Sequence, residues 1–194
     1  MKTMRIDLRG LLSGLALCLM LSGASLAEGR ADESNAQLNA LFHDLAEATT
    51  ETAAAKTIHE IWQIWTGDSE NSTSKVMMEH GLTLMQAGNF KGAERVFTQL
   101  IEREPDYMEA WNKRATVRYM LSNLTGSEED IAEVLVREPR HFGALSGLAM
   151  IRLKRGNMEE ALKLYRHILT INPFSPDALR LIPEIEVQLR GDPA

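Results

Sequence analysis

Three prolines, Pro105, Pro139 and Pro173, follow one another at an interval of 34 residues. A proline cannot donate to a helix ladder and restricts the residue before it, so each one marks a point where a helix has ended. Three consecutive windows each end two residues after one of these prolines: 74–107, 108–141 and 142–175. A period of this length predicts stacked two-helix units, each burying its apolar face against its neighbours.

Other residue types recur in the same phase. Small residues stand at two fixed positions of each window, where packed helices must approach closely: Gly81, Ala115 and Ala149, then Ala93, Ser127 and Ala161. Bulky apolar residues recur four positions after the second set: Phe97, Ile131 and Tyr165. Glycines in 87–89 and 155–157 indicate tight turns between paired helices, because glycine readily takes the left-handed geometry that closes a helix.

The segment GLTLMQAGNFKGAERVFTQLIEREPDY, residues 81–107, resembles a tetratricopeptide repeat throughout, and the three windows cover 102 of the 194 residues. The resemblance implies an all-α, right-handed solenoid of three helical hairpins. The second window departs from the family pattern at Arg114 and Arg118, where the family usually has leucine and an aromatic residue. We expect these arginines either to add positive charge to a binding surface or to pair with acids of the neighbouring helix. Residues 124–126 suggest a less regular start to the second helix of that window.

Helices are also expected on both sides of the repeats. Residues 176–194 contain a C-terminal capping helix from Pro176 to Arg190, with leucines and isoleucines on one stripe. Residues 28–73 contain an N-terminal helical pair, roughly Asn35–Thr49 and Glu51–Trp65, followed by a polar link from Gly67 to Ser74.

Residues 1–27 have the pattern of a secretory signal peptide, in which basic residues precede an apolar run from Leu11 to Leu21. Ser25 and Ala27 suit a cleavage site, so we expect a mature chain that begins at Glu28, is exported, and is periplasmic if the host is bacterial. An uncleaved anchor would need a longer apolar stretch, and Cys18 sits in a poor context for a lipid anchor. No stable membrane insertion is expected after cleavage.

Composition argues against several kinds of function. After cleavage 18 basic and 26 acidic residues would remain, giving a formal charge of −8, which disfavours nucleic-acid binding. Removing Cys18 leaves no thiol for catalysis or metal binding. His59-Glu60 lacks the second histidine of a zinc-protease helix, and the other histidines show no metal-ligand spacing. We therefore expect no enzyme activity, metal or cofactor.

The resemblance implies that the first helices of the hairpins line a concave groove that binds a protein or peptide partner. The expected groove residues are Met78, Leu82, Met85, Asn112, Lys113, Thr116, Tyr119, Ser146, Met150 and Lys154. Asn112 is the expected polar anchor, because an amide can hydrogen-bond a peptide backbone in both senses. The methionines could equally be core residues, since methionine fills irregular gaps. Met78 and Leu82 replace the polar residues with which some family members bind a C-terminal carboxylate.

Two functions follow from this surface. The first is a periplasmic adaptor that holds a peptide segment of an envelope protein in the groove. The alternative is a structural subunit of a larger envelope complex, or the non-catalytic part of an enzyme assembly, which uses its outer faces.

Overall fold

The computed structural model describes residues 34–67 and 71–191. The chain forms two units, residues 1–40 and residues 41–194. In the first unit the described residues, 34–40, are helical, and in the second the helix continues to residue 46. The expected signal peptide, with Cys18 and the cleavage site, lies outside the described residues.

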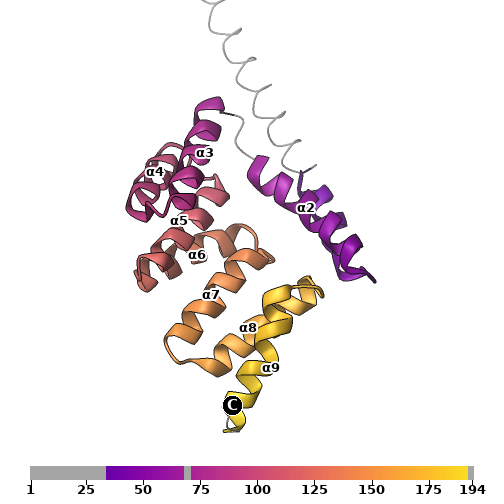
Figure 1. The fold of residues 1–194 in the computed structure, drawn as a ribbon. Helices are drawn as coiled ribbons and strands as arrows, with labels where there is room; N and C mark the ends of the chain where they lie inside the picture. The colour runs from indigo at the N-terminus through magenta and orange to yellow at the C-terminus, as the bar shows by residue number, and fades with distance from the viewer. Residues whose placement is uncertain (1–33, 68–70, 192–194) are drawn as a thin grey trace, which may run out of the picture. The chain divides into compact units, whose positions relative to one another are not determined.

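The second unit is a row of helical hairpins, and all regular structure in the described residues is α-helical. In chain order the helices are α2 (Glu51–Gly67), α3 (Ser72–Gln86), α4 (Phe90–Arg103), α5 (Met108–Met120), α6 (Leu124–Arg137), α7 (Phe142–Lys154), α8 (Met158–Ile171) and α9 (Pro176–Arg190). Each helix from α3 to α9 packs on the next, as Figure 1 shows from magenta through orange to yellow. The expected all-α solenoid with a C-terminal helix is confirmed.

The three hairpin turns share one backbone geometry. Gly88 and Gly156 have φ of 72° and 80°, and Ser122 takes the equivalent place in the central hairpin with φ of 62°. The helix after the first turn begins with the Asn89 side chain accepting from the Gly92 N–H at 3.0 Å. Asn123 accepts from the Gly126 N–H at 3.1 Å in the same way, so the irregular start expected for α6 is not seen.

Small residues lie where helices approach most closely. Ala93 and Ala161 are fully buried inside their hairpins. A Cβ added at Gly81 would collide with the ring of Phe97, which is itself fully buried. The recurring small positions are therefore required by hairpin packing, as the repeat pattern predicted.

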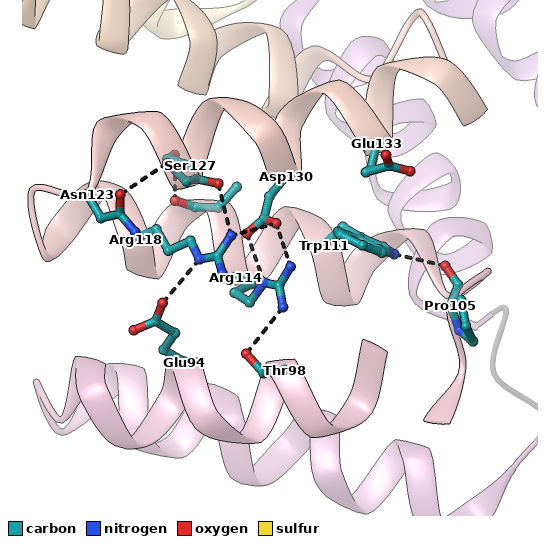
Figure 2. A network of polar contacts seen from close by, with 12 residues as sticks. Glu94, Thr98, Pro105, Trp111, Arg114, Arg118, Asn123, Ser127, Asp130 and Glu133 are labelled. Carbon is teal, nitrogen blue, oxygen red and sulfur yellow. Dashed lines mark hydrogen bonds and ion pairs between the residues drawn. The ribbon is translucent and has the colours of Figure 1, made fainter. Parts of the chain in front are cut away.

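The central hairpin contains a network of ion pairs built on Arg114, Arg118 and Asp130. Asp130 on α6 receives hydrogen bonds from Arg114 at 2.7 and 2.9 Å and from Arg118 at 2.9 Å. Arg118 also pairs with Glu94 at 3.1 Å, and Arg114 donates to Thr98, so both guanidinium groups bridge to α4 (Figure 2). Of the two expectations for these arginines, internal pairing is the one observed.

The link before the repeats differs from its expected length. Helix α2 continues to Gly67 and α3 begins at Ser72, with the side chain of Asn71 accepting from the Thr73 N–H. Ser74 is therefore inside a helix, where its hydroxyl is buried and donates to Glu104 at 2.5 Å. Asn71 starts the helix earlier than the polar composition suggested, because its side chain satisfies a free backbone donor.

No helix within the described residues is long and apolar enough to cross a membrane.

Candidate functional site

An open pocket of about 610 Å³ lies on the face formed by the first helices of the second and third hairpins. Residues of α5 and α7 contribute most of its lining, and α2, α6, the segment between α8 and α9, and the start of α9 contribute the rest. Phe142, Met120 and Met150 make much of this lining apolar. Met120 and Met150 are 53% and 39% exposed, so apolar side chains remain available to a partner.

Half of the predicted groove residues line this pocket: Asn112, Thr116, Tyr119, Ser146 and Met150. The glycines of this lining are covered by the chain's own side chains, because a Cβ added at Gly143 would lie 3.2 Å from Trp62 and one added at Gly147 would lie 3.3 Å from Ile131.

The residues predicted in the first hairpin lie elsewhere. Met78 is buried in a cluster with Phe97 and Leu100, and Leu82 and Met85 pack against the same cluster. The placement of Met78 in the groove was thus wrong, because its flexible side chain fills the core between α3 and α4. A binding role for Leu82 and Met85 stays a prediction.

The two predicted lysines are engaged by the chain itself. The Lys113 ammonium lies 3.1 Å from the Glu109 carboxylate and 5.0 Å from the ring centroid of Trp62. Lys154 lies 4.9 Å from the ring centroid of Tyr119, at the rim of the pocket, and 3.4 Å from the Ser122 hydroxyl. Neither residue lines the pocket, although Lys154 positions a side chain that does.

Helix α2 forms one wall of the pocket, through Ala55 and Ile58. Its other end is held by Trp65, which stacks on His141 with ring centroids 4.0 Å apart and planes at 16°. The hydroxyl of Tyr107 donates to the backbone carbonyl of Thr66 at 3.0 Å. The apolar spacing along 58–65 indicated a buried face, but it did not indicate which surface would cover that face.

A buried charged centre lies beneath Trp65. Glu109 and His141 are both fully buried, and Glu109 Oε1 is 2.8 Å from His141 Nε2. Burial acts to raise the pKa of Glu109. Hydrogen bonds from His141 and Asn112 and the positive charge of Lys113 outweigh it, so the pKa lies below its ordinary value. The carboxylate therefore stays ionised and holds the starts of α5 and α7 together.

Two nearly buried asparagines are among the polar residues of the pocket lining. Asn112 is 6% exposed, and its Nδ2 donates to both oxygens of Glu109 at 3.1 and 3.2 Å. Asn172 is 4% exposed, and its Oδ1 accepts from the Phe174 N–H at 3.1 Å. Glu109 occupies one N–H of the Asn112 amide, and the expectation that Asn112 bonds a ligand stays a prediction. Asn172 was not predicted, since the repeat pattern explains an asparagine before a proline as a helix end.

Within residues 34–67 and 71–191, no three histidine, cysteine or acidic side chains come together in a way that could hold a metal ion. The pocket lining offers apolar contact, two amide side chains, and the carboxylate of Asp177, which lies 3.6 Å from the Arg180 guanidinium. It also contains the hydroxyl residues Thr116, Tyr119, Ser127, Ser146 and Ser175.

Comparison with known families and relatives agrees with this geometry. The family model described as Tetratricopeptide repeat matches residues 78–138 and 121–176. A TPR repeat-containing protein of Rhizobium etli is 33% identical over 156 residues, which span 80% of this chain and 76% of the relative.

Solved structures show the same fold at lower identity. The first TPR of Spaghetti (RPAP3), bound to the HSP90 peptide SRMEEVD, superposes with a TM-score of 0.57 at 21% identity, covering 60% of this chain and 93% of that one. The Arabidopsis OM64 TPR domain gives 0.56 at 19% identity, covering 58% and 93%. A tetratricopeptide repeat protein from Parabacteroides merdae gives 0.55 at 19% identity, covering 82% of this chain and 61% of that one.

Proposed function

Because the chain belongs to the tetratricopeptide repeat family, we propose that it is a non-catalytic scaffold that holds a segment of another protein in the pocket between α2, α5 and α7. The observation that carries the proposal is the open, mainly apolar pocket itself, with Met120 and Met150 exposed in it. Contiguous exposed apolar surface in a groove is typical of a binding site. A related fold, the first TPR of RPAP3, holds a peptide.

The setting of this function is proposed from the sequence. The N-terminal pattern of residues 1–27 supports export, and the periplasm if the host is bacterial. The partner would then be a protein of the envelope. Recognition of a C-terminal carboxylate is disfavoured, because Met78 is a core residue.

A structural role through the outer faces is the second candidate. Val136 on α6 and Leu179 on α9 are 80% and 52% exposed, so each of these helices presents an apolar side chain to a partner. An assembly through these helices would leave the pocket open.

One pair of variants separates the two functions. The protein, purified as its host processes it, is used to select peptides from a random dodecapeptide library, and the peptides are then titrated against Met150→Glu and Val136→Glu. Both changes add a carboxylate at an exposed apolar position, and only Met150 lines the pocket. We expect Met150→Glu to weaken peptide binding by about tenfold or more and Val136→Glu to leave it unchanged. Equal binding by both variants contradicts the pocket, and loss of an oligomer in Val136→Glu favours the second candidate.

A further inference from the structure

The methionines in the described part of the chain differ widely in exposure. Met78 and Met108 are 7% and 6% exposed, whereas Met120 and Met150 are the most exposed, at 53% and 39%. Oxidants convert a methionine thioether to a sulfoxide, and because the oxidant must reach the sulfur, susceptibility follows exposure. Met120 and Met150 are therefore the methionines that an oxidant in solution reaches first.

These two methionines belong to one site. Met120 ends α5, Met150 lies on α7, and both line the pocket in which the scaffold function is proposed. Met78 and Met108 are not part of that lining. The two most exposed thioethers thus coincide with the candidate binding surface.

A thiol would compete for the same oxidant, but the sequence has a single cysteine, Cys18. Cys18 lies in residues 1–27, which we expect to be cleaved on export. Methionine is then the remaining sulfur residue of the chain. Export also takes a protein out of the compartment in which sulfur groups are kept reduced. Oxidation of the pocket methionines therefore suits the setting proposed for the protein.

We propose that Met120 and Met150 form a reversible oxidation site, at which a hydroperoxide converts both thioethers to sulfoxides and thereby weakens the hold of the pocket on its partner. The inference rests on the proposed function and adds a means of regulating it. In each reaction an S–O bond forms on the thioether sulfur and the O–O bond of the peroxide breaks. The sulfur loses two electrons to the peroxide. With hydrogen peroxide, the departing oxygen takes up the proton of the transferred hydroxyl and leaves as water.

The sulfoxide changes the chemistry of the pocket lining. A thioether is apolar and flexible, whereas a sulfoxide carries a polar oxygen that hydrogen-bonds water. An apolar partner that covers this oxygen removes those hydrogen bonds, which costs binding free energy. The fold is spared, because buried methionines such as Met78 and Met108 are shielded. Sulfoxide reductases reverse the change, since two thiols return two electrons to the sulfur and the oxygen leaves as water.

The first measurement asks which sulfur atoms react. The protein, purified as its host processes it, is treated with hydrogen peroxide and digested with trypsin, which places Met108, Met120 and Met150 on separate peptides. Mass spectrometry over time then gives one rate of sulfoxide formation for each. We expect Met120 and Met150 to react at least about tenfold faster than the buried Met108.

The second measurement asks whether oxidation controls binding. The probe is a peptide selected from the dodecapeptide library that contains no methionine, cysteine or tryptophan, so that peroxide leaves the probe itself intact. We expect peroxide treatment of the protein to weaken binding by about tenfold. Methionine sulfoxide reductases for both sulfoxide epimers, with dithiothreitol as the reductant, should restore the affinity.

Leucine variants assign the effect to the two sulfur atoms. Met120→Leu combined with Met150→Leu removes both thioethers and keeps apolar side chains of similar volume. Met158→Leu is the matched control, because it makes the same change at a partly buried methionine outside the pocket lining. The affinity of each variant before peroxide is its own reference. Peroxide should leave the double variant within about twofold of that reference and should weaken Met158→Leu by about tenfold, like the wild type.

The proposal is overturned by equal oxidation rates at Met108 and Met120, by an unchanged affinity after both sulfoxides have formed, by a loss that the reductases do not reverse, or by an equal loss in the double leucine variant. In those cases the peptide still binds the untreated protein and Met150→Glu still weakens it, so the scaffold function survives. If Met150→Glu has no effect on any selected peptide, both proposals fail.

Discussion

Glu109 and His141 are 32 residues apart in the sequence, yet Glu109 Oε1 and His141 Nε2 lie 2.8 Å apart with both side chains fully buried. The other ring nitrogen of His141 accepts the backbone N–H of Ala144 at 3.0 Å and so caps α7. A nitrogen that accepts a hydrogen bond carries no proton, so the ring proton is on Nε2 and is donated to Glu109. Trp65 of α2 stacks on the same ring. One histidine therefore joins α2, α5 and α7.

The first prediction concerns acid stability. The pKa of Glu109 is raised by burial and lowered more strongly by its partners, first by the hydrogen bond from His141, so it lies below the ordinary 4.5. A carboxyl with a lower pKa in the folded state stabilises the fold above its unfolded pKa, and this stabilisation is lost as the pH falls through the folded pKa. We expect the urea midpoint to fall as the pH drops below 4.5.

Glu109→Gln is the variant that isolates this effect. It removes the titrating group, so the variant should be less stable at neutral pH and should lose less stability on acidification than the wild type. Glu128, whose pKa is lowered chiefly by the hydrogen bond from Arg152, remains in the variant. Part of the loss of stability on acidification should therefore remain. An unchanged acid slope in Glu109→Gln would assign the effect to other carboxylates.

The second prediction concerns the ion network of the central hairpin. Asp130→Ala should lower the free energy of unfolding by about 3–5 kcal/mol, because it leaves the buried guanidinium of Arg114 without its partner. Glu133→Ala on the same helix is the control. Its pair with Arg137 is partly exposed, so the loss should stay below about 1 kcal/mol. Similar midpoints for the two variants in urea unfolding would contradict the larger loss of stability expected for Asp130→Ala.

The hairpins could be predicted from the sequence because their causes are local. The spacing of prolines, the small residues and the glycine turns each act within one window, and the family resemblance covered the same residues. The departure at Arg114 and Arg118 was visible as well, but its outcome depended on Asp130 and Glu94, which lie on two other helices. Sequence alone left that question open.

The site was predicted less well because its geometry depends on contacts between distant segments. Helix α2 reaches the pocket through the stacking of Trp65 on His141, which no periodic pattern encodes. Met78 turned into the core, because a small rotation about a helix axis separates groove positions from core positions. The orientation of Asn112 depended on the buried charge of Glu109.

The third prediction concerns the turn of the central hairpin. Ser122 holds φ of 62°, where the other two turns have glycine. Left-handed backbone is strained for residues with a Cβ, so Ser122→Gly should raise stability by about 0.5–1 kcal/mol, measured as a higher thermal midpoint. Gly156→Ser makes the reverse change in the next hairpin and should lower stability by a similar amount. A lower midpoint for Ser122→Gly would mean that the contact of its hydroxyl with Lys154 outweighs the strain.

The fourth prediction concerns the close contact inside the hairpins. Ala161 is fully buried, so Ala161→Leu should destabilise by about 1–3 kcal/mol through overpacking, and Ala93→Leu should behave alike. Ala132 on α6 is exposed, and Ala132→Leu should have little effect on the melting midpoint. An unchanged midpoint for Ala161→Leu would show that the repeat register does not control packing.

The last prediction concerns Asn112, which the sequence suggested as a polar anchor whose removal would leave the fold intact. Its Nδ2 donates to Glu109, so Asn112→Ala removes one of the bonds that stabilise a buried carboxylate and should lower the free energy of unfolding by about 1 kcal/mol. Asn112 also lines the pocket, so binding of the selected peptide should weaken in the same variant. Thr116→Ala is the control for stability. Thr116 also lines the pocket, but it is exposed and its hydroxyl donates only to the Asn112 carbonyl within the same helix, so the free energy of unfolding should stay nearly unchanged. A loss of stability without a loss of affinity would make Asn112 purely structural. A loss of affinity with an unchanged midpoint would mean that the bond to Glu109 contributes little, and that Asn112 serves the ligand alone.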